Sequence, residues 1–298
     1  VNNTLRVTDT TWEGIVSTNG SSPQAWAQAF DVMPHGALLR NLNNLLTKSQ
    51  VSEDEIITKL LASAPTSKEL PFKYWAALQA LGSTASKKMT AAIEVAMTQA
   101  VGSLPQLHGK VACLVDNSGS AHGAFTAEKA RTTVAEIGNL TGVITALAAE
   151  EGWVGVFGDR LQMFKADKKK TIVNNLAPVT TSGKSIGGGT EHGIWVFWDK
   201  AIKDREHWDS VFVYSDMQAG HAGLFGRGVP SADCAHGQYI DVLKMIDRYR
   251  STVNKNVKVF LVQTAGYGDS LVPEAYRDTY ILGGWSPQII RYASFMGA

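Results

Sequence analysis

The sequence predicts an α/β fold, with a doubly wound, mostly parallel sheet preceded by a small all-α segment of helical repeats. The first observation is helical spacing of apolar residues, with short connections, up to about residue 108. The second is the alternation of apolar strands and helical segments thereafter. The third is that these strands are apolar throughout, as in parallel sheets covered on both faces. We therefore expect a helical segment over 1–108 and an α/β domain over 109–298.

The helical segment divides into amphipathic helices with recognisable starts and stops. Pro34 ends one helical run and separates it from the next. Ser52 and Glu55 form a capping-box pattern at the start of another. Short loops between such helices indicate a bundle or a stack of helix pairs. Helices are predicted over 24–33 and 36–48, from 52, from 71, and over 85–101.

The α/β domain is predicted from apolar strands and the helical segments between them. Strands are expected over 111–115, 153–157, 161–164 (as a hairpin partner), 211–214, 257–262 and 281–282. Helices are expected over 127–151, 191–201, 239–250 and 287–295. Ligands of such sheets bind beyond the carboxyl ends of the strands. Asp116 and Asp216 each follow a predicted strand, so we expect both at that edge.

Composition excludes several classes of protein. The 298 residues carry a net charge of +1, which gives no general reason to expect nucleic-acid or membrane binding. Two cysteines make no disulfide framework and favour a reducing compartment. No signal peptide is recognisable, and no apolar run approaches the ~18 residues that a membrane span needs. We therefore expect a cytoplasmic protein with no membrane association.

The pattern Asp116-x-Ser118-x-Ser120 places a carboxylate and two hydroxyls on a tight loop after a strand. Two more oxygen donors follow in the chain. Thr190 comes after three glycines at a helix start, and Asp216 ends a strand. Oxygen ligands with few carboxylates suit Mg²⁺, or alternatively Mn²⁺ or Ca²⁺, and leave the cation able to bind an acidic group of a partner. The alternative is that the serines merely cap the following helix.

These residues resemble, in order and spacing, the metal-ion-dependent adhesion site of von Willebrand factor A domains. The resemblance covers about 109–298 and implies their Rossmann-like fold. One difference is local: many members have methionine directly after the second serine, where this chain has Ala121 followed by His122. We interpret His122 as a residue at the rim of the site. The resemblance implies five metal ligands, some acting through water: Asp116, Ser118, Ser120, Thr190 and Asp216.

A second resemblance concerns the helical segment. Met33-Pro34 with the run 37–42, Trp12-Glu13-Gly14, and the 104–109 join to the first strand are similar to the TROVE domain of Ro autoantigen-type proteins. That family implies a ring of helical repeats. The ring would bind small noncoding RNA on its outer face and the single-stranded 3′ ends of misfolded RNA in its central hole. About 108 helical residues match the last part of such a ring.

Candidate RNA contacts are few. Residues 1–108 hold eight basic and eight acidic residues, so RNA binding would need an asymmetric face. Arg40 is interpreted as a phosphate contact or a helix-surface arginine, and Asn41 could line the same surface or simply be solvated. The basic run is either a solvated helix start or a phosphate contact near the metal face. It comprises Lys168, Lys169 and Lys170.

A long glycine-rich loop over 217–236 follows Asp216 directly and should form part of the metal rim, with His221 as a rim residue. The histidines and cysteine in and beside this loop match no zinc-binding spacing. Gly183-Lys184-Ser185 imitates the end of a phosphate-binding loop, but the earlier glycine is missing. We find no catalytic set and predict that the chain is not an enzyme.

Two functions remain open on the sequence alone, beside a weaker third, a metal-dependent nuclease. The first is a non-catalytic protein with a Mg²⁺-dependent ligand site that binds small noncoding or misfolded RNA, as in Ro-type ribonucleoproteins. The second is a metal-dependent adaptor that holds an acidic group of a protein partner and binds no RNA. Replacing Asp116 with alanine is expected to abolish metal-dependent binding without unfolding the protein, on the interpretation that the loop lies at the surface.

Overall fold

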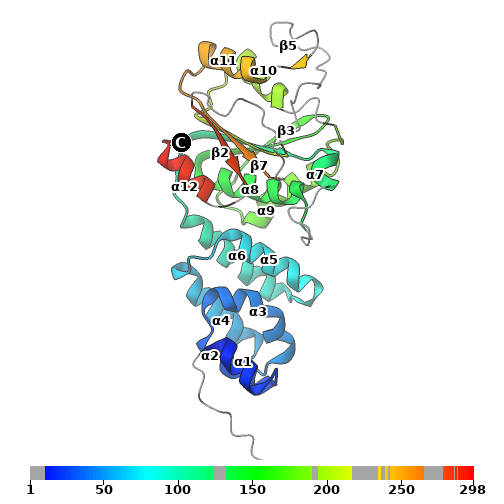
Figure 1. Ribbon diagram of the computed structural model, residues 1–298, viewed down its shortest axis with the longest axis vertical. Coiled ribbons are helices and arrows are strands. Elements are labelled where there is room, and N and C mark those ends of the chain that lie inside the picture. The colour runs from blue at the N-terminus through cyan, green and yellow to red at the C-terminus, as the bar shows by residue number, and fades with distance from the viewer. Residues whose placement is uncertain are drawn as a thin grey trace, which may run out of the picture. The chain divides into compact units, whose positions relative to one another are not determined.

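The computed structural model describes residues 11–123, 132–189, 194–216, 234–235, 239–240, 242–264, 278–284, 286 and 288–298. The chain divides into two compact units, Val1–Ser103 and Leu104–Ala298 (Figure 1). Each unit is described by itself below. Among the described residues, no helix has both the length and the apolar character needed to cross a membrane.

The first unit is entirely helical, as the sequence predicts. Its helices are α1 (Trp12–Asn19), α2 (Pro23–Val32), α3 (His35–Lys48), α4 (Glu53–Ser63), α5 (Pro71–Leu81) and α6 (Lys87–Gly102), with short 3₁₀ turns η1 (Ala64–Thr66) and η2 (Gly82–Thr84). Helix α1 was not predicted; Thr11 caps it by accepting a hydrogen bond from the Gly14 amide. The apolar faces of the later helices meet in a core that includes Leu38, Leu60 and Ile93.

Side-chain caps fix where these helices begin. Ser52 accepts a hydrogen bond from the Glu55 amide, and the Glu55 carboxylate accepts one from the Ser52 amide, so the predicted capping box is confirmed. Ser22 and Ser86 cap α2 and α6 with one hydrogen bond each, accepted from the Ala25 and Met89 amides. Each cap satisfies an amide that the first turn leaves without a partner.

The second unit contains a six-stranded sheet. Its strands are β1 (Leu107–Asp116), β2 (Ala149–Phe157), β3 (Leu161–Lys165), β4 (Ser210–Ser215), β7 (Lys258–Gln263) and β8 (Thr279–Gly283), in the order β3-β2-β1-β4-β7-β8. All neighbours are parallel except β2 and β3, which form the predicted hairpin. A separate two-stranded pair joins β5 (Cys234–Ala235) to β6 (Tyr239–Ile240).

Helices cover both faces of the sheet, which confirms the doubly wound α/β prediction. One face carries α8 (Val134–Ala148), α9 (Ile172–Gly183) and α12 (Gln288–Phe295), and the other carries α10 (Ile194–Lys203) and α11 (Val242–Thr252) (Figure 1). The register pairs Asp116 with Phe157 and Val115 with Tyr214. The carboxyl ends of β1, β2 and β4 therefore lie at one edge.

The predicted end of the helix over 127–151 is wrong. Helix α8 ends at Ala148, and β2 begins at the next residue, earlier than predicted. The Ala149 amide bonds to the Ala146 carbonyl as the helix closes, and Ala149 already pairs with Leu107 of β1. The Ala-rich end of the helix gives no stop signal, so parallel pairing with β1 decides where the helix ends.

Helix α9 was not predicted. It begins at a Thr171 cap, which accepts a hydrogen bond from the Asn174 amide, and it has Pro178 in its interior. An internal proline removes one helical hydrogen bond and argues against a helix from sequence alone. Burial of Leu176 and Val179 against the sheet offsets that loss. The helix predicted over 239–250 is also displaced, since Tyr239–Ile240 is a strand and α11 begins at Val242.

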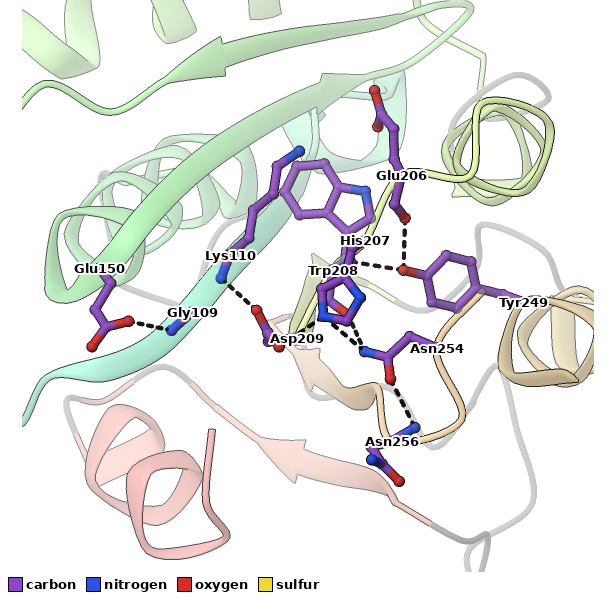
Figure 2. A network of polar contacts seen from close by, with 10 residues as sticks. All are labelled: Gly109, Lys110, Glu150, Glu206, His207, Trp208, Asp209, Tyr249, Asn254 and Asn256. Carbon is purple, nitrogen blue, oxygen red and sulfur yellow. Dashed lines mark hydrogen bonds and ion pairs between the residues drawn. The ribbon is translucent and has the colours of Figure 1, made fainter. Parts of the chain in front are cut away.

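The start of β1 depends on a glycine. Gly109 has φ +71°, and its missing Cβ would lie 2.0 Å from a carboxylate oxygen of Asp209. That carboxylate accepts a hydrogen bond from the Lys110 amide at 2.7 Å, and Glu150 accepts one from the Gly109 amide at 2.8 Å (Figure 2). The glycine thus lets two carboxylates bind consecutive backbone amides.

Replacing Gly109 with alanine should lower the free energy of unfolding by about 2–4 kcal/mol, because it adds left-handed strain and displaces Asp209. Gly283→Ala is the control, since that glycine lies in a strand with open space at its Cβ position. Urea denaturation of both variants measures the difference. Equal stability of the two variants would contradict this account of the β1 start.

Candidate metal centre

Asp116 is the centre of the predicted site and is buried. It ends β1 and is 1% exposed. One carboxylate oxygen accepts a hydrogen bond from the Ser118 amide at 2.9 Å, and the other accepts one from the Ser215 hydroxyl at 2.6 Å. Loss of hydration raises the pKa of Asp116 to about 6, although these hydrogen bonds lower it. The structure thus fixes the carboxylate firmly but gives its negative charge incomplete compensation.

Asp216 is the second carboxylate at this edge. It follows the last residue of β4 and is fully buried. Its charge contributes to the raised pKa of Asp116, which means that the two carboxylates influence each other across the ends of neighbouring strands. Two buried carboxylates that oppose each other's ionisation are the arrangement that a divalent cation would stabilise.

Two serine hydroxyls lie on the same loop. The hydroxyls of Ser118 and Ser120 are 3.0 Å apart. Ser118 also accepts a weak hydrogen bond, 3.4 Å long, from the amide of Ala121 in the short helix α7 (Gly119–Gly123). The capping role considered from the sequence is therefore present and does not displace the contact between the two hydroxyls. Thr190, the fifth predicted ligand, lies outside the described residues.

The glycine-rich segment before Thr190 packs against this loop. The Gly119 amide donates a hydrogen bond to the Gly188 carbonyl at 2.7 Å. Asp159, which follows β2, accepts a hydrogen bond from the Gly189 amide at 2.6 Å. Gly187 has φ +100°, and a Cβ there would lie 2.0 Å from the Asp159 carboxylate. Asp159 thus holds the segment 187–189 beside the Asp116 loop.

Sequence reasoning missed the amide pair that anchors the Asp116 loop. Asn117 and Asn139 exchange two hydrogen bonds, of 2.8 and 2.9 Å, and both side chains are buried. The backbone N–H of Asn117 also donates a hydrogen bond to the Phe157 carbonyl at 2.8 Å, which ties the loop to the end of β2. A polar residue in the apolar sequence of helix α8 was the available signal.

Two exposed basic residues near the site were not singled out from the sequence as site residues. Arg160 donates a hydrogen bond to the Ser185 carbonyl at 2.9 Å, and Lys184 follows Gly183, whose backbone lies against Asn117. Both basic side chains are exposed. Their sequence signals were the Gly183-Lys184-Ser185 pattern and the turn after β2.

Of the two predicted rim residues, the structure describes one. His122 is exposed on α7, and its Nε2 lies 3.2 Å from the Gly183 carbonyl, at hydrogen-bond distance and beside the Asp116 loop. His221 lies outside the described residues.

The predicted surface position of Asp116 is wrong, because β1 carries its carboxylate into the buried edge between β2 and β4. Removing that side chain would leave the Ser118 amide and Ser215 hydroxyl without their acceptor.

The basic run is not near the metal face, so that alternative is wrong. Lys165 at the end of β3 pairs with Trp153 early in β2, because β3 runs antiparallel. The run follows in the turn before α9, at the edge where β1 and β2 begin, opposite Asp116. All three side chains are exposed, as expected of a solvated helix start. They are Lys168, Lys169 and Lys170.

The two candidate RNA contacts on α3 differ in exposure. Asn41 is 9% exposed, and its amide donates to the Ala37 carbonyl and accepts a hydrogen bond from Asn44, so it does not present a free surface amide. Arg40 is exposed and lies with Lys73 in a groove of about 430 Å³ between α3 and α5. Lys73 was not singled out by the sequence. Glu69 lines the same groove, so the charged residues of the lining carry a net charge of +1.

The donor set suits a hard cation bound by few charges. Within the described residues, no three His, Cys, Asp or Glu side chains come together as a metal-binding group. The centre instead combines two carboxylates with hydroxyls, and such sites retain positions for water or a ligand. The residues present therefore fit Mg²⁺ or Mn²⁺ better than zinc.

Comparison with known proteins tests the family prediction. Residues 6–108 match the family model of the TROVE domain. This stretch of the chain is therefore similar to a TROVE domain. The fold is similar to that of the crystal structure of the Deinococcus radiodurans RO (RSR) protein, with a TM-score of 0.64 and 16% sequence identity. The match covers 93% of this chain and 56% of that one, so this chain spans about half the length of its structural relative. A comparison with curated proteins found no match.

Proposed function

We propose that this chain is a non-catalytic RNA-binding protein. In this proposal, the site at Asp116 and Asp216 holds a divalent cation that binds an acidic group, and small noncoding RNA or an RNA 3′ end supplies that group as phosphate. The observation that carries the proposal is the convergence of two buried carboxylates and two serine hydroxyls at the strand ends of a chain whose helical segment is similar to a TROVE domain. A cytoplasmic location remains the expectation from composition.

The metal centre would follow the ligand set of a metal-ion-dependent adhesion site. Asp116, Ser118, Ser120 and Asp216 would hold the cation, directly or through water, with Thr190 as the fifth predicted ligand. The cation would supply positive charge that polarises a bound phosphate or carboxylate. Asn139 and Asp159 would act by positioning the loops, because they bind loop backbone and amide groups and none of the reacting or ligating atoms.

The charge beside the centre favours phosphate over a protein carboxylate. Arg160 and Lys184 are exposed next to the Asp116 loop, and two cations near a metal-bound anion suit the higher charge of phosphate. The protein-adaptor function would need neither cation. We therefore place RNA first and treat the adaptor as an outcome of the tests below.

The groove on α3 and α5 would supply a second RNA contact. Replacing Arg40 or Lys73 with glutamine should weaken binding of a structured RNA with a single-stranded 3′ tail. Each variant should also reduce the salt dependence of the binding constant by about 0.7 in the log–log slope, the loss of one phosphate contact on single-stranded RNA. Fluorescence anisotropy titrations over a range of salt concentrations measure both quantities.

Lys48→Gln is the matched control, because Lys48 is exposed on the same helix but lies outside the groove. Its binding constant and salt slope should match those of the wild type. If Arg40→Gln and Lys73→Gln behave like this control while the wild type binds RNA, the groove is not the contact. If the wild type fails to bind any RNA but binds an acidic peptide in Mg²⁺, the adaptor function replaces the proposal.

A further inference from the structure

A small aromatic cavity lies in the α/β unit, on the sheet face covered by α10 and α11. Its volume is about 230 Å³. Trp153, Leu161 and Met163 form one wall from β2 and β3, and Phe197 and Trp208 form the other from α10 and the segment before β4. The first three side chains are partly exposed, so a ligand has access beside the edge strand.

Lys110 brings a positive charge to this cavity. Its ammonium lies 4.1 Å from the ring centre of Trp208 and 5.7 Å from that of Trp153. Figure 2 shows the lysine chain running from β1 to the side of the Trp208 indole. Within the part of the chain that the structure describes, no carboxylate lies within ion-pair distance of this ammonium. Contact with the two rings offsets only part of the cost of leaving water.

The other charges around the cavity are already paired. Lys200 lies 3.0 Å from Glu206, and both line the cavity. Lys165 lies 5.6 Å from the ring centre of Trp153 and pairs with Glu151 at 3.4 Å. Lys110 has no direct carboxylate partner among the described residues, although its charge helps to lower the pKa of Glu151. The charged residues that line the cavity, Lys110, Lys200 and Glu206, together carry one positive charge, which a monoanion would balance.

Trp208 contributes an aromatic wall. Its side chain is 2% exposed and its indole N–H is buried, so a ligand in the cavity would meet the ring and not this donor. The Lys110 ammonium is thus the donor that calls for an acceptor, and the remaining walls call for an apolar body.

We propose that this cavity binds a small aromatic carboxylate, with the carboxylate on the Lys110 ammonium and the ring against the walls formed by Trp153 and Phe197. The volume supports this size, because ordinary ligand pockets begin near 300 Å³ and a 150 Å³ cavity accepts one benzene. A monoanion fits better than a phosphate dianion, because Glu206 lies at the same cavity. The source is either a free aromatic acid or the C-terminal aromatic residue of a peptide. The inference is independent of RNA binding.

Titration of the full chain with indole-3-acetate and with an N-acetylated peptide ending in phenylalanine tests the proposal. The readout is the side-chain indole N–H resonances of Trp153 and Trp208 in NMR spectra, which are assigned with Trp153→Phe. Indole-3-acetamide and the amidated peptide are the neutral controls. We expect at least one carboxylate to bind and its amide to bind at least about tenfold more weakly.

Lys110→Met should weaken carboxylate binding by about ten- to hundredfold, because it keeps the apolar stem and removes the charge. Lys110→Arg should retain binding, and it also guards against a folding defect in the methionine variant. Lys165→Met is the matched control and should bind like the wild type, since Lys165 lies over the same Trp153 ring but is already paired.

Binding of the free acid alone or of the peptide alone would support the proposal and identify the source. Equal affinity for acid and amide would overturn it, as would unchanged binding by Lys110→Met. No resonance shift at millimolar concentrations of either carboxylate would also overturn it. Binding of adenosine monophosphate in the absence of carboxylate binding would replace the proposed ligand class.

Discussion

Replacing Asp116 with asparagine is expected to abolish the stabilisation of the protein by Mg²⁺ and to make the metal-free protein more stable at neutral pH. Asparagine keeps an oxygen for the Ser118 amide and an amide group beside the Ser215 hydroxyl. It lacks the charge that a cation requires and that burial disfavours. Asparagine is therefore a sharper test than alanine, which would leave two buried donors without an acceptor.

The pH dependence has a definite sign. Burial raises the pKa of Asp116 from an ordinary 3.8 to about 6 in the folded state. Below about pH 4 the Asp116 carboxyl is protonated in both the folded and the unfolded state, so its burial does not reduce the free energy of unfolding. That free energy falls as the pH rises through about 6, where the folded state must bury a charged carboxylate. The loss amounts to about 3 kcal/mol in the metal-free wild type. The asparagine variant does not ionise, so its advantage over the wild type should appear only above about pH 4 and level off above pH 6.

Urea denaturation at acid and neutral pH, with Mg²⁺ and with EDTA, measures these effects. At neutral pH, Mg²⁺ should stabilise the wild type and leave Asp116→Asn unchanged. At acid pH the cation should stabilise neither protein, because protons occupy Asp116. A variant less stable than the wild type at neutral pH in EDTA would contradict the account, as would equal stabilisation of both proteins by Mg²⁺.

Replacing Asn139 with leucine should lower the free energy of unfolding by about 2–4 kcal/mol, because it removes the partner of the buried Asn117 amide. Leucine has the same branching as asparagine but is apolar and larger, so no cavity forms and the unsatisfied Asn117 amide contributes to the expected loss. Asn117 lies between Asp116 and Ser118, so a loosened loop should also weaken Mg²⁺ binding.

Thr141→Val is the matched control on the same helix. Thr141 is equally buried, but its hydroxyl donates to the Ile137 carbonyl of its own helix, so its loss leaves no distant group unpaired. Urea denaturation gives the stability of both variants, and isothermal titration calorimetry gives the Mg²⁺ affinity. A stable Asn139→Leu variant with wild-type affinity would show that the amide pair does not position the loop.

The fold could be predicted where the local signals agree with tertiary packing. The capping box at Ser52 and the hairpin of β2 and β3 fall where the sequence places them. Prediction failed where packing overrides local preference. Helix α9 forms despite Pro178 because its apolar face is buried, and α8 ends at Ala148 because the next residue pairs with β1.

Of the candidate site, only the place of its two carboxylates could be predicted. Asp116 and Asp216 lie at neighbouring strand ends, as expected for parallel strands. Their burial and the contacts of Asn139 and Arg160 could not be predicted, because they depend on which loops pack together. The alternative that placed the basic run 168–170 near the metal face failed for a topological reason. An antiparallel edge strand carries Lys168 and its neighbours to the opposite end of the sheet.

The central claim is that a cation at Asp116 and Asp216 binds RNA phosphate. Electrophoretic mobility-shift titration of a structured RNA with a single-stranded 3′ tail, in Mg²⁺ and in EDTA, tests it most directly when wild type and Asp116→Asn are compared. The account predicts that the wild type binds more tightly in Mg²⁺ and that the variant in Mg²⁺ binds only as the wild type does in EDTA. Equal affinity of the two proteins in Mg²⁺, or RNA binding by the wild type that EDTA leaves unchanged, would contradict it.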